Sequence, residues 1–187
     1  MPSPGVTLRP FREEDLELLF RVYASTRWEE LAPVPWDDGQ KAAFLRMQAE
    51  AQHAYYQENY KGADWLVIER FGLPAGRLYV HRREKEIRLV DISLLPEHRN
   101  AGIGTALLRE LIAESNAAEK PLRIHVEKNN PAMTLYARLG FRPIGWSRRR
   151  LLFSRKAVMS VSSAGGPESL RAAPPGAAAD GGRGGEK

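Results

Sequence analysis

Three strand-like runs, followed directly by a glycine loop and a helix, limit the folds open to this chain of 187 residues. The runs "DWLVIER", "GRLYVHRR" and "IRLVDISLL" are separated by the short turns "FGLPA" and "REKE". This spacing predicts sequential antiparallel strands. The "RNAGIG" loop then opens a helix whose apolar face consists of Leu107, Leu108, Leu111 and Ile112. Strands that succeed one another without helices between them exclude a doubly wound parallel sheet.

The N-terminal part predicts a short strand, "VTLRP", and two helices. The first helix lies in "EEDLELLFRVYAS", and its apolar stripe consists of Leu16, Leu19, Phe20 and Tyr23. "WEELAPVPW" is expected to be a loop because it carries two prolines. The second helix, "DDGQKAAFLRMQAEAQHAYYQEN", begins with capping aspartates. Its apolar face is expected to consist of Phe44, Met47, Ala51 and Ala54.

After the glycine loop, helices and strands alternate. "LRIHV" is a strand, "NPAMTLYARLGF" is a helix with Pro131 in its first turn and Gly140 at its end, and "RRLLFSRKAVM" is the last strand. The order predicts an α+β fold with a mixed sheet. Residues 5–159 form a single domain in this interpretation. Residues 160–187 are rich in glycine, alanine and proline with little to bury, which predicts a disordered tail.

Composition excludes several classes of function. The chain has no cysteine, which removes disulfides and thiolate chemistry, and its four histidines lack metal-ligand spacing, so no metal is expected. No signal peptide or membrane span is recognisable, and a cytoplasmic protein follows by default. The net charge of +5 comes mostly from interspersed acids and bases. We therefore expect no nucleic-acid partner, although "SRRRLLFSRK" is a basic cluster.

The glycine loop favours a phosphate ligand. A dinucleotide-binding loop would need a third glycine where Leu107 stands, and a nucleoside-triphosphatase loop would need a lysine. A plain strand-to-helix turn remains an alternative. The spacing of Arg99, Gly102 and Gly104 is R-x-x-G-x-G at a helix start, where unpaired backbone N–H groups can cradle a pyrophosphate.

"LLPEHRNAGIGTALL" followed by "NNPAMTLYARLGF" resembles the Gcn5-related N-acetyltransferase (GNAT) superfamily. The resemblance implies a single-domain fold with a mostly antiparallel central sheet, helices on both faces and a splayed central strand pair. It also implies an acetyltransferase that uses acetyl-coenzyme A as cosubstrate and needs no metal.

The resemblance assigns roles to particular residues. The backbone of Ile92, Ser93 and Leu94 would pair with the pantetheine arm, and Tyr136 would protonate the departing thiolate. The pyrophosphate would be wrapped by Arg99, Asn100, Ala101, Gly102, Ile103, Gly104 and Thr105. A pantetheine-contacting asparagine is also expected, and the motif leaves two candidates, Asn129 and Asn130.

Acetyl transfer to an amine also requires a neutral nitrogen, so a base is sought. Asp91 lies within an apolar run, where it is either a base or a structural carboxylate whose hydrogen bonds are satisfied. His125 titrates in the right range and shares one strand face with Glu127, although a purely structural histidine is commoner.

The expected reaction is direct acetyl transfer in a ternary complex to the primary amine of a small molecule. The first two helices and their loop would meet the acceptor, and they offer Trp28, Glu29, Glu30, Trp36, Tyr55 and Tyr56. Two alternatives stay open: a protein acetyltransferase acting on an N-terminus or lysine, and a non-catalytic acyl-coenzyme A-binding domain. No membrane partner is expected, and a homodimer is left open.

Overall fold

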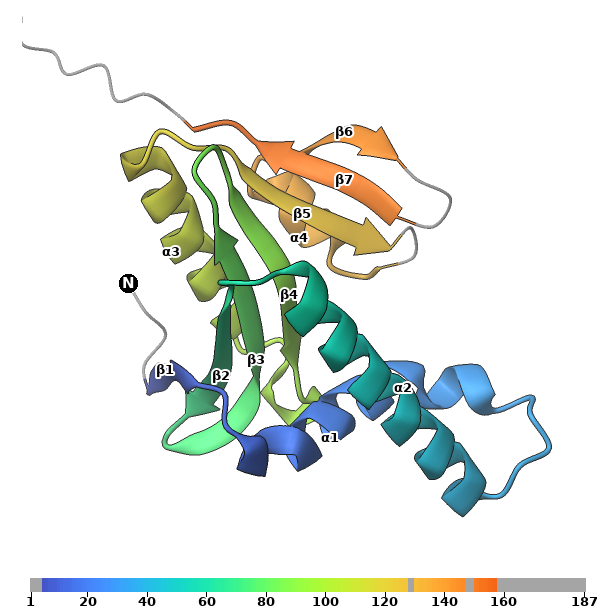
Figure 1. Ribbon diagram of the computed structural model, residues 1–187. Helices are drawn as coiled ribbons and strands as arrows, with labels where there is room; N and C mark the ends of the chain where they lie inside the picture. Colours follow the sequence, from blue (N-terminus) through green and yellow to red (C-terminus); the bar gives the residue numbers. More distant parts are fainter. Residues whose placement is uncertain (1–4, 128–129, 147–149, 158–187) are drawn as a thin grey trace, which may run out of the picture.

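The computed structural model describes residues 5–127, 130–146 and 150–157. A seven-stranded sheet with the order β1-β2-β3-β4-β5-β7-β6 forms its centre (Figure 1). The strands are β1 Val6–Pro10, β2 Asp64–Arg70, β3 Leu73–Arg82, β4 Ile87–Leu94, β5 Leu122–Glu127, β6 Arg142–Trp146 and β7 Arg150–Arg155. The α-helices are α1 Leu16–Arg27, α2 Asp38–Asn59, α3 Ile103–Ala117 and α4 Met133–Arg138.

Strands β1 to β4 form the predicted antiparallel meander. Strand β3 begins at Leu73, earlier than expected, because the turn is only Phe71 and Gly72, both with positive φ. In β4, Val90 is an extra residue: Tyr79 pairs with Asp91, whereas Val80 pairs with Leu89. Such a bulge bends a strand and redirects its side chains.

The sheet forks between β4 and β5. These strands are parallel, and they pair only from Ile87 to Leu89 of β4 with Leu122 to Ile124 of β5. Beyond that point β5 follows β7, with which it pairs along its whole length. Figure 1 shows the two strand groups diverging. The predicted α+β class and mixed, mostly antiparallel sheet are confirmed.

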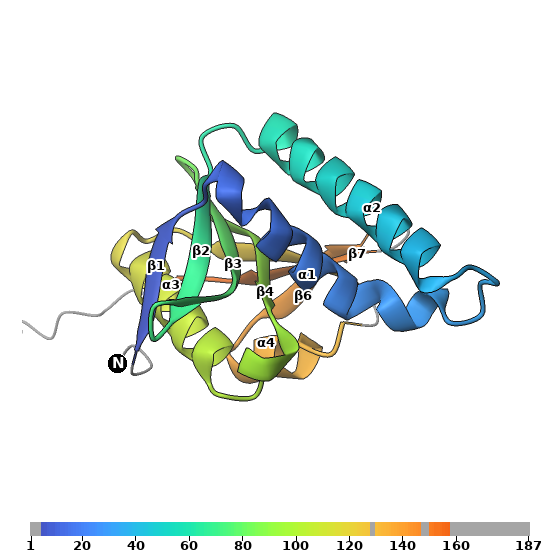
Figure 2. The ribbon, with the colours of Figure 1, turned by 90° about the horizontal axis from the view of Figure 1, so that it is seen from below.

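Helices α3 and α4 cover one face of the sheet and α1 and α2 the other (Figure 2). The predicted stripe of α3 is correct: Leu107, Leu108 and Leu111 are buried, and Ile112 packs beside them. Their large aliphatic side chains leave this helix no alternative face to bury.

The predicted apolar face is partly correct for α1, where Leu19 is buried and Phe20 and Tyr23 are half-buried, and wrong for α2. Helix α1 buries Leu18, Leu19 and Val22, while Leu16 is exposed. Helix α2 buries Leu45, Ala49, His53 and Tyr56, whereas Met47 is 54% exposed. The inner face of α2 includes the polar and aromatic residues His53 and Tyr56. A search for regularly spaced aliphatic residues does not detect such a face. The predicted cap is confirmed, because Asp37 Oδ1 accepts a hydrogen bond from the Gln40 amide at 2.8 Å.

The C-terminal part differs in two details. Helix α4 begins at Met133, so Pro131 precedes the helix, while Gly140 ends it with a φ of 85°. Strand β6 was not expected from the sequence, because Pro143 and Gly145 disfavour strands; it is an edge strand with a register shift between these two residues. Residues 158–187, including the predicted tail, lie outside the described residues.

Candidate functional site

The loop between β4 and α3 is shaped by its backbone. Asn100 and Gly102 have φ angles of 58° and 78°, and Gly102 is the N-cap of α3. The first backbone N–H groups of a helix lack partners within it, so they can bind an anion. A Cβ atom added at Gly102 or Gly104 would meet no atom within 4 Å. Protein packing therefore does not fill the space above this helix end, which fits an expected pyrophosphate.

The Arg99 side chain turns away from that helix end. Its Nε donates to the Leu94 carbonyl at 2.9 Å, and its Nη2 donates to Ser25 Oγ on α1 at 2.7 Å. Arg99 therefore ties the loop to β4 and α1. In this arrangement the cradle for a phosphate consists of backbone groups, and the contribution expected of the Arg99 guanidinium is not visible.

The second half of β4 carries the predicted pantetheine-pairing residues. Pairing between β4 and β5 ends at Leu89, so the edge of Ile92, Ser93 and Leu94 that faces β5 is not used in the described sheet. On the other edge, Gly76 of β3 approaches so closely that a Cβ atom there would lie 2.2 Å from the Ser93 carbonyl. An extended ligand arm can therefore add to β4 as a strand.

Tyr136 lies on α4, behind the fork, and is 3% exposed. Its ring packs edge-on against Phe141, with 5.7 Å between the ring centroids. Burial, and after it the negative charge of Asp91, raises the pKa of the Tyr136 phenol. The phenol therefore stays protonated across the neutral range, as a proton donor must.

Asp91 is held in a buried ion pair. Arg77 Nη2 donates to Asp91 Oδ2 at 2.6 Å, and Ser93 Oγ donates to the other carboxylate oxygen at 2.8 Å. Arg77 also donates to Gln52 of α2 at 2.7 Å. Of the two alternatives for Asp91, this geometry favours the structural carboxylate, because protein donors already bind both of its carboxylate oxygens.

Unpaired polar atoms surround this ion pair. Within the described part of the chain, Arg77 Nε and Nη1, the Tyr79 hydroxyl and His53 Nδ1 are buried without hydrogen-bond partners. Burial raises the pKa of Tyr79 to about 12. Burial and the nearby Arg77 charge lower the pKa of His53. Arg77 was not among the residues predicted for the site, although an arginine inside a buried strand was the available signal.

His125 is exposed on β5, on the face opposite to its buried neighbours Ile124 and Val126. Arg88 Nη1 lies 3.2 Å from His125 Nδ1. Glu86 in turn holds Arg88: Arg88 Nη2 donates a hydrogen bond to Glu86 Oε1 at 2.9 Å. Burial alone would raise the pKa of Glu86, but the surrounding arginines, Arg88 first, lower it. The contact occupies a ring nitrogen of His125 and does not identify this residue as a base.

The choice between Asn129 and Asn130 as the pantetheine-contacting residue stays a prediction. Asn130 Oδ1 accepts a hydrogen bond from the Ala132 amide at 2.8 Å, so this oxygen shapes the turn into α4. Asn129 lies outside the described residues.

The expected acceptor side is partly open. Trp28 and Trp36 are each 39% exposed, and Tyr55 is also exposed. Tyr56 is buried against Tyr79 and belongs to the core. Arg27 joins this side to β5, donating to Glu30 at 3.0 Å and to Glu127 at 2.8 Å.

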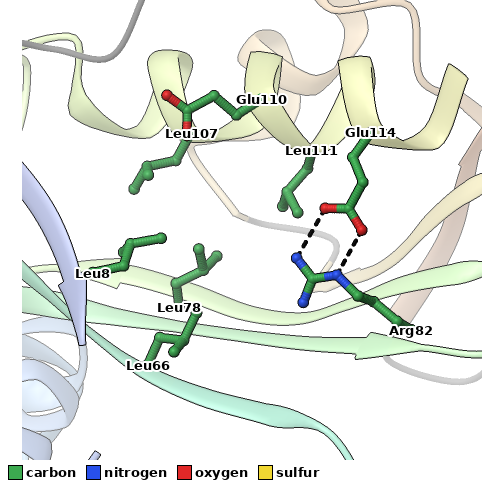
Figure 3. A pocket seen from close by; sticks show the side chains of 8 residues that line it. All are labelled: Leu8, Leu66, Leu78, Arg82, Leu107, Glu110, Leu111 and Glu114. Atoms are coloured by element: carbon green, nitrogen blue, oxygen red, sulfur yellow. Dashed lines mark hydrogen bonds and ion pairs between the residues drawn. The ribbon is translucent and has the colours of Figure 1, made fainter. Parts of the chain in front are cut away.

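A small hollow lies elsewhere, between β1 to β3 and α3 (Figure 3). Its volume is about 90 Å³, and Leu8, Leu66, Leu78, Leu107 and Leu111 line it together with Arg82, Glu110 and Glu114. Arg82 donates to both carboxylate oxygens of Glu114 across its rim. The hollow is too small for a cofactor and contains neither Tyr136 nor the glycine loop.

Among the described residues, no helix combines the length and apolar character of a membrane span.

Residues 61–143 match a family model described as "Acetyltransferase (GNAT) domain". The match runs from the turn before β2 into β6, so it includes the fork, the glycine loop and α4.

Two relatives carry acetyltransferase names. A Bacillus subtilis (strain 168) protein named "Putative ribosomal protein bS18-alanine N-acetyltransferase" is 29% identical over 141 residues, which cover 74% of this chain and 82% of that protein. An N-alpha-acetyltransferase of Sulfurisphaera tokodaii is 39% identical over 64 residues, 32% of this chain and 38% of that protein.

Solved structures share the fold. PaiA N-acetyltransferase from Thermoplasma acidophilum in complex with coenzyme A has a TM-score of 0.60 at 18% identity, covering 81% of this chain and 98% of that one. The ribosomal-protein-S18-alanine N-acetyltransferase from Escherichia coli has a TM-score of 0.57 at 19% identity, covering 84% and 97%. The single-domain fold with a splayed strand pair is confirmed.

Proposed function

The chain belongs to the Gcn5-related N-acetyltransferase superfamily, and from this premise we propose that it acetylates the α-amino group at the N-terminus of a protein or peptide. Acetyl-coenzyme A is the donor. The observation that carries the choice of acceptor is the similarity, over 74% of the chain, to a protein named for acetylating an alanine of a ribosomal protein. The second relative is likewise named an N-alpha-acetyltransferase.

The donor side follows from the fork and the glycine loop. Backbone N–H groups at the start of α3 bind the pyrophosphate, and the free edge of Ile92 to Leu94 holds the pantetheine arm as an added strand. A backbone N–H near Leu94 polarises the thioester carbonyl. Transfer is direct, within a ternary complex.

Tyr136 acts on the leaving sulfur. Its raised pKa makes it a weaker acid than a thiol, whose usual value is near 8.5. Its main contribution is therefore a hydrogen bond to the sulfur as negative charge develops there. As the C–S bond breaks, the thiolate takes the phenol proton, and the proton released by the acetylated nitrogen restores the phenol, so no phenolate accumulates.

The contacts of the two candidate bases, Asp91 and His125, bear on the choice of acceptor. Asp91 is paired with Arg77, and His125 lies beside Arg88. An α-amino group has a pKa of about 7.7–8.0, against about 10.4 for a lysine side chain. A substantial fraction of α-amino groups is therefore neutral near pH 7.5 without help, which favours an N-terminal acceptor over an alkyl amine. The exposed tryptophans also suit an extended peptide better than an enclosed small molecule.

Thiol release from acetyl-coenzyme A tests this proposal. We expect turnover with a peptide that begins with a free alanine, and none with the same peptide blocked at its N-terminus but retaining an internal lysine. A polyamine and a free amino acid complete the panel. Preference for the polyamine would restore the small-molecule acceptor expected from the sequence. Coenzyme binding without thiol release on any amine would instead favour a non-catalytic domain.

The domain limits of 5–159, the tail 160–187 and the cytoplasmic location stay predictions. They do not affect the acceptor test, which uses the full chain.

A further inference from the structure

The outward face of α2 is unusually apolar for a helix on the surface. Phe44 is half-buried, Met47 and Tyr55 are 54% and 53% exposed, and Ala51 and Ala54 are exposed. These residues follow the helical period along three turns. A surface helix normally presents charged and polar residues on its solvent side. This is the face that the spacing of apolar residues predicted to be buried, and the buried hydrophobic clusters within residues 5–127, 130–146 and 150–157 do not include it.

Two charged residues flank the face: Glu50 is exposed at its edge, next to Met47 and Ala54 in the helical period, and Arg46 lies on the α1 side. Arg46 turns toward α1, where its Nη2 donates to Glu17 at 2.9 Å and its guanidinium lies 4.2 Å from the Phe20 ring centroid. Trp36, from the loop before α2, packs edge-on against Phe44 with 5.4 Å between ring centroids, which enlarges the apolar surface. Contiguous exposed apolar surface commonly marks a site of protein association.

We propose that a second copy of this chain covers this face, with the two α2 helices antiparallel about a two-fold axis. The order of the residues along the contacting face of α2, here called the seam, supports this arrangement. Lys41, Phe44, Gln48, Ala51, Tyr55 and Glu58 alternate in steps of three and four, the spacing of helices that pack along their length.

A two-fold axis between positions 49 and 50 makes this seam complementary to itself. It places Lys41 opposite Glu58 of the second copy, Phe44 opposite Tyr55, and Gln48 opposite Ala51. Opposite charges meet at both ends, aromatic rings meet inside them, and a small residue lies near the axis, where the backbones approach. Neither Lys41 nor Glu58 belongs to an ion pair found among the described residues.

The position of α2 leaves room for a second copy. The helix has 22 residues, a length of about 33 Å, and Figure 1 shows its N-terminal half extending beyond the sheet. A single helix pair lies at the small end of specific interfaces, so the dimer is expected to be weak and to form at micromolar concentrations. Tyr55 also belongs to the expected acceptor side, so the dimer would cover part of that side. Sedimentation measures the dimer and thiol release measures the choice of acceptor, so the two proposals fail separately.

Sedimentation velocity of the full chain over a range of concentrations tests the dimer. We expect a concentration-dependent dimer that Ala51→Arg abolishes, because a long charged side chain cannot be buried at the seam. Ala113→Arg, at an exposed alanine of α3, is the matched control and should leave the dimer intact. A protein that stays monomeric up to about 1 mM, or a dimer that Ala51→Arg leaves unchanged, would overturn the proposal.

Charge reversal tests the antiparallel register. Lys41→Glu and Glu58→Lys each place like charges opposite one another twice per dimer, so each should weaken association by about fivefold or more. Combined, they restore opposite charges, and the affinity should return to within about twofold of the original. Additive weakening in the double variant would contradict the register. Because the chain has no cysteine, oxidation of Gln48→Cys/Ala51→Cys gives a clean second readout: a cross-linked dimer is expected, and none from Glu84→Cys on the β3–β4 turn.

Discussion

The two faces of the central sheet bury different kinds of side chain. Toward α3 and α4 the core is almost entirely aliphatic, with Tyr136, Phe141 and Phe153 among many leucines, isoleucines and valines. Toward α1 and α2 the sheet buries Arg77, His53, Tyr79 and Tyr56, with the Arg77–Asp91 ion pair among them. The first face adjoins the glycine loop and the second adjoins the expected acceptor side.

Because of this difference, the proposed donor side and the expected acceptor side depend on different kinds of interaction. The donor side relies on backbone groups positioned by an apolar core, so it tolerates many side chains as long as the backbone path is kept. The acceptor side depends on particular charged and polar partners, each of which is costly to bury alone. Donor-side variants should therefore change coenzyme binding and turnover in a folded protein, whereas acceptor-side variants should first change stability.

The largest effect is expected at Gly102. Gly102→Asp should abolish measurable coenzyme binding in calorimetric titration, because a carboxylate would repel the pyrophosphate at the start of α3. Gly102→Asn is the matched control, since it has the same size, tolerates a positive φ and lacks the charge. It should weaken binding less. Equal affinity of the aspartate variant and the parent protein would remove the phosphate site.

Tyr136→Phe is expected to lower the turnover number by about 10²–10⁴-fold, the usual contribution of general acid catalysis. The Michaelis constant for the coenzyme should change little, because the glycine loop is untouched. The raised pKa of Tyr136 also places any loss of activity from its ionisation above pH 10. Tyr79→Phe is the control from the other face, because its buried hydroxyl has no hydrogen-bond partner among the described residues. Turnover of Tyr136→Phe within about threefold of the parent would make Tyr136 a packing residue.

Asp91→Asn tests the acceptor-side face. It leaves the buried Arg77 cation without its counter-charge, so the free energy of unfolding in urea should fall by about 3 kcal/mol. Ser93→Ala removes only a hydrogen bond to the same carboxylate and should cost about 1 kcal/mol. Unchanged stability together with lost turnover, and a changed acidic limb of the pH–rate profile, would identify Asp91 as the base.

The smallest effect concerns pH. The pKa of His53 is lowered in the folded protein, so between pH 7 and 5 the unfolded chain takes up the proton first and the free energy of unfolding falls. His81 acts in the same direction. The pKa values of Asp15 and Glu86 are lowered in the folded protein. Their contributions to the free energy of unfolding are therefore present at pH 5 to 7 and are lost only as the pH falls below the ordinary carboxylate pKa. His53→Phe should reduce the slope measured by urea unfolding in this window, and an unchanged slope would contradict its burial as a neutral ring.

The difference between the faces also explains what could be predicted from the sequence. The α3 stripe and the meander were predicted correctly because aliphatic residues at regular spacing fix which side is buried. The turn into α3 was recognisable because glycine adopts a positive φ at little cost, and Gly102 has a φ of 78°. The phosphate-binding role of this loop stays a prediction.

The inner face of α2 could not be predicted in this way. His53 packs against Phe11 and lies near Arg77, and Tyr56 packs against Tyr79. These partners are far from α2 in the sequence, so the sequence pattern of α2 does not reveal the burial. The prediction for α2 was also wrong because most of its regularly spaced apolar residues are exposed. Spacing shows that a face is apolar, but not which surface covers it. The pairing of Asp91 with Arg77 likewise depends on the register of β3 with β4.

The brevity of the β4–β5 pairing also bears on how long the protein persists in a cell. Only three residue pairs join β1–β4 to the β5–β7–β6 group, so the sheet has its weakest hydrogen-bonded connection at its centre. Local opening, and the proteolysis that follows it, is expected to begin there. A donor that spans the fork stabilises the closed form by mass action, by about 2.7 kcal/mol at one hundred times its dissociation constant. The supply of acetyl-coenzyme A would then set the abundance of the protein as well as its rate of turnover.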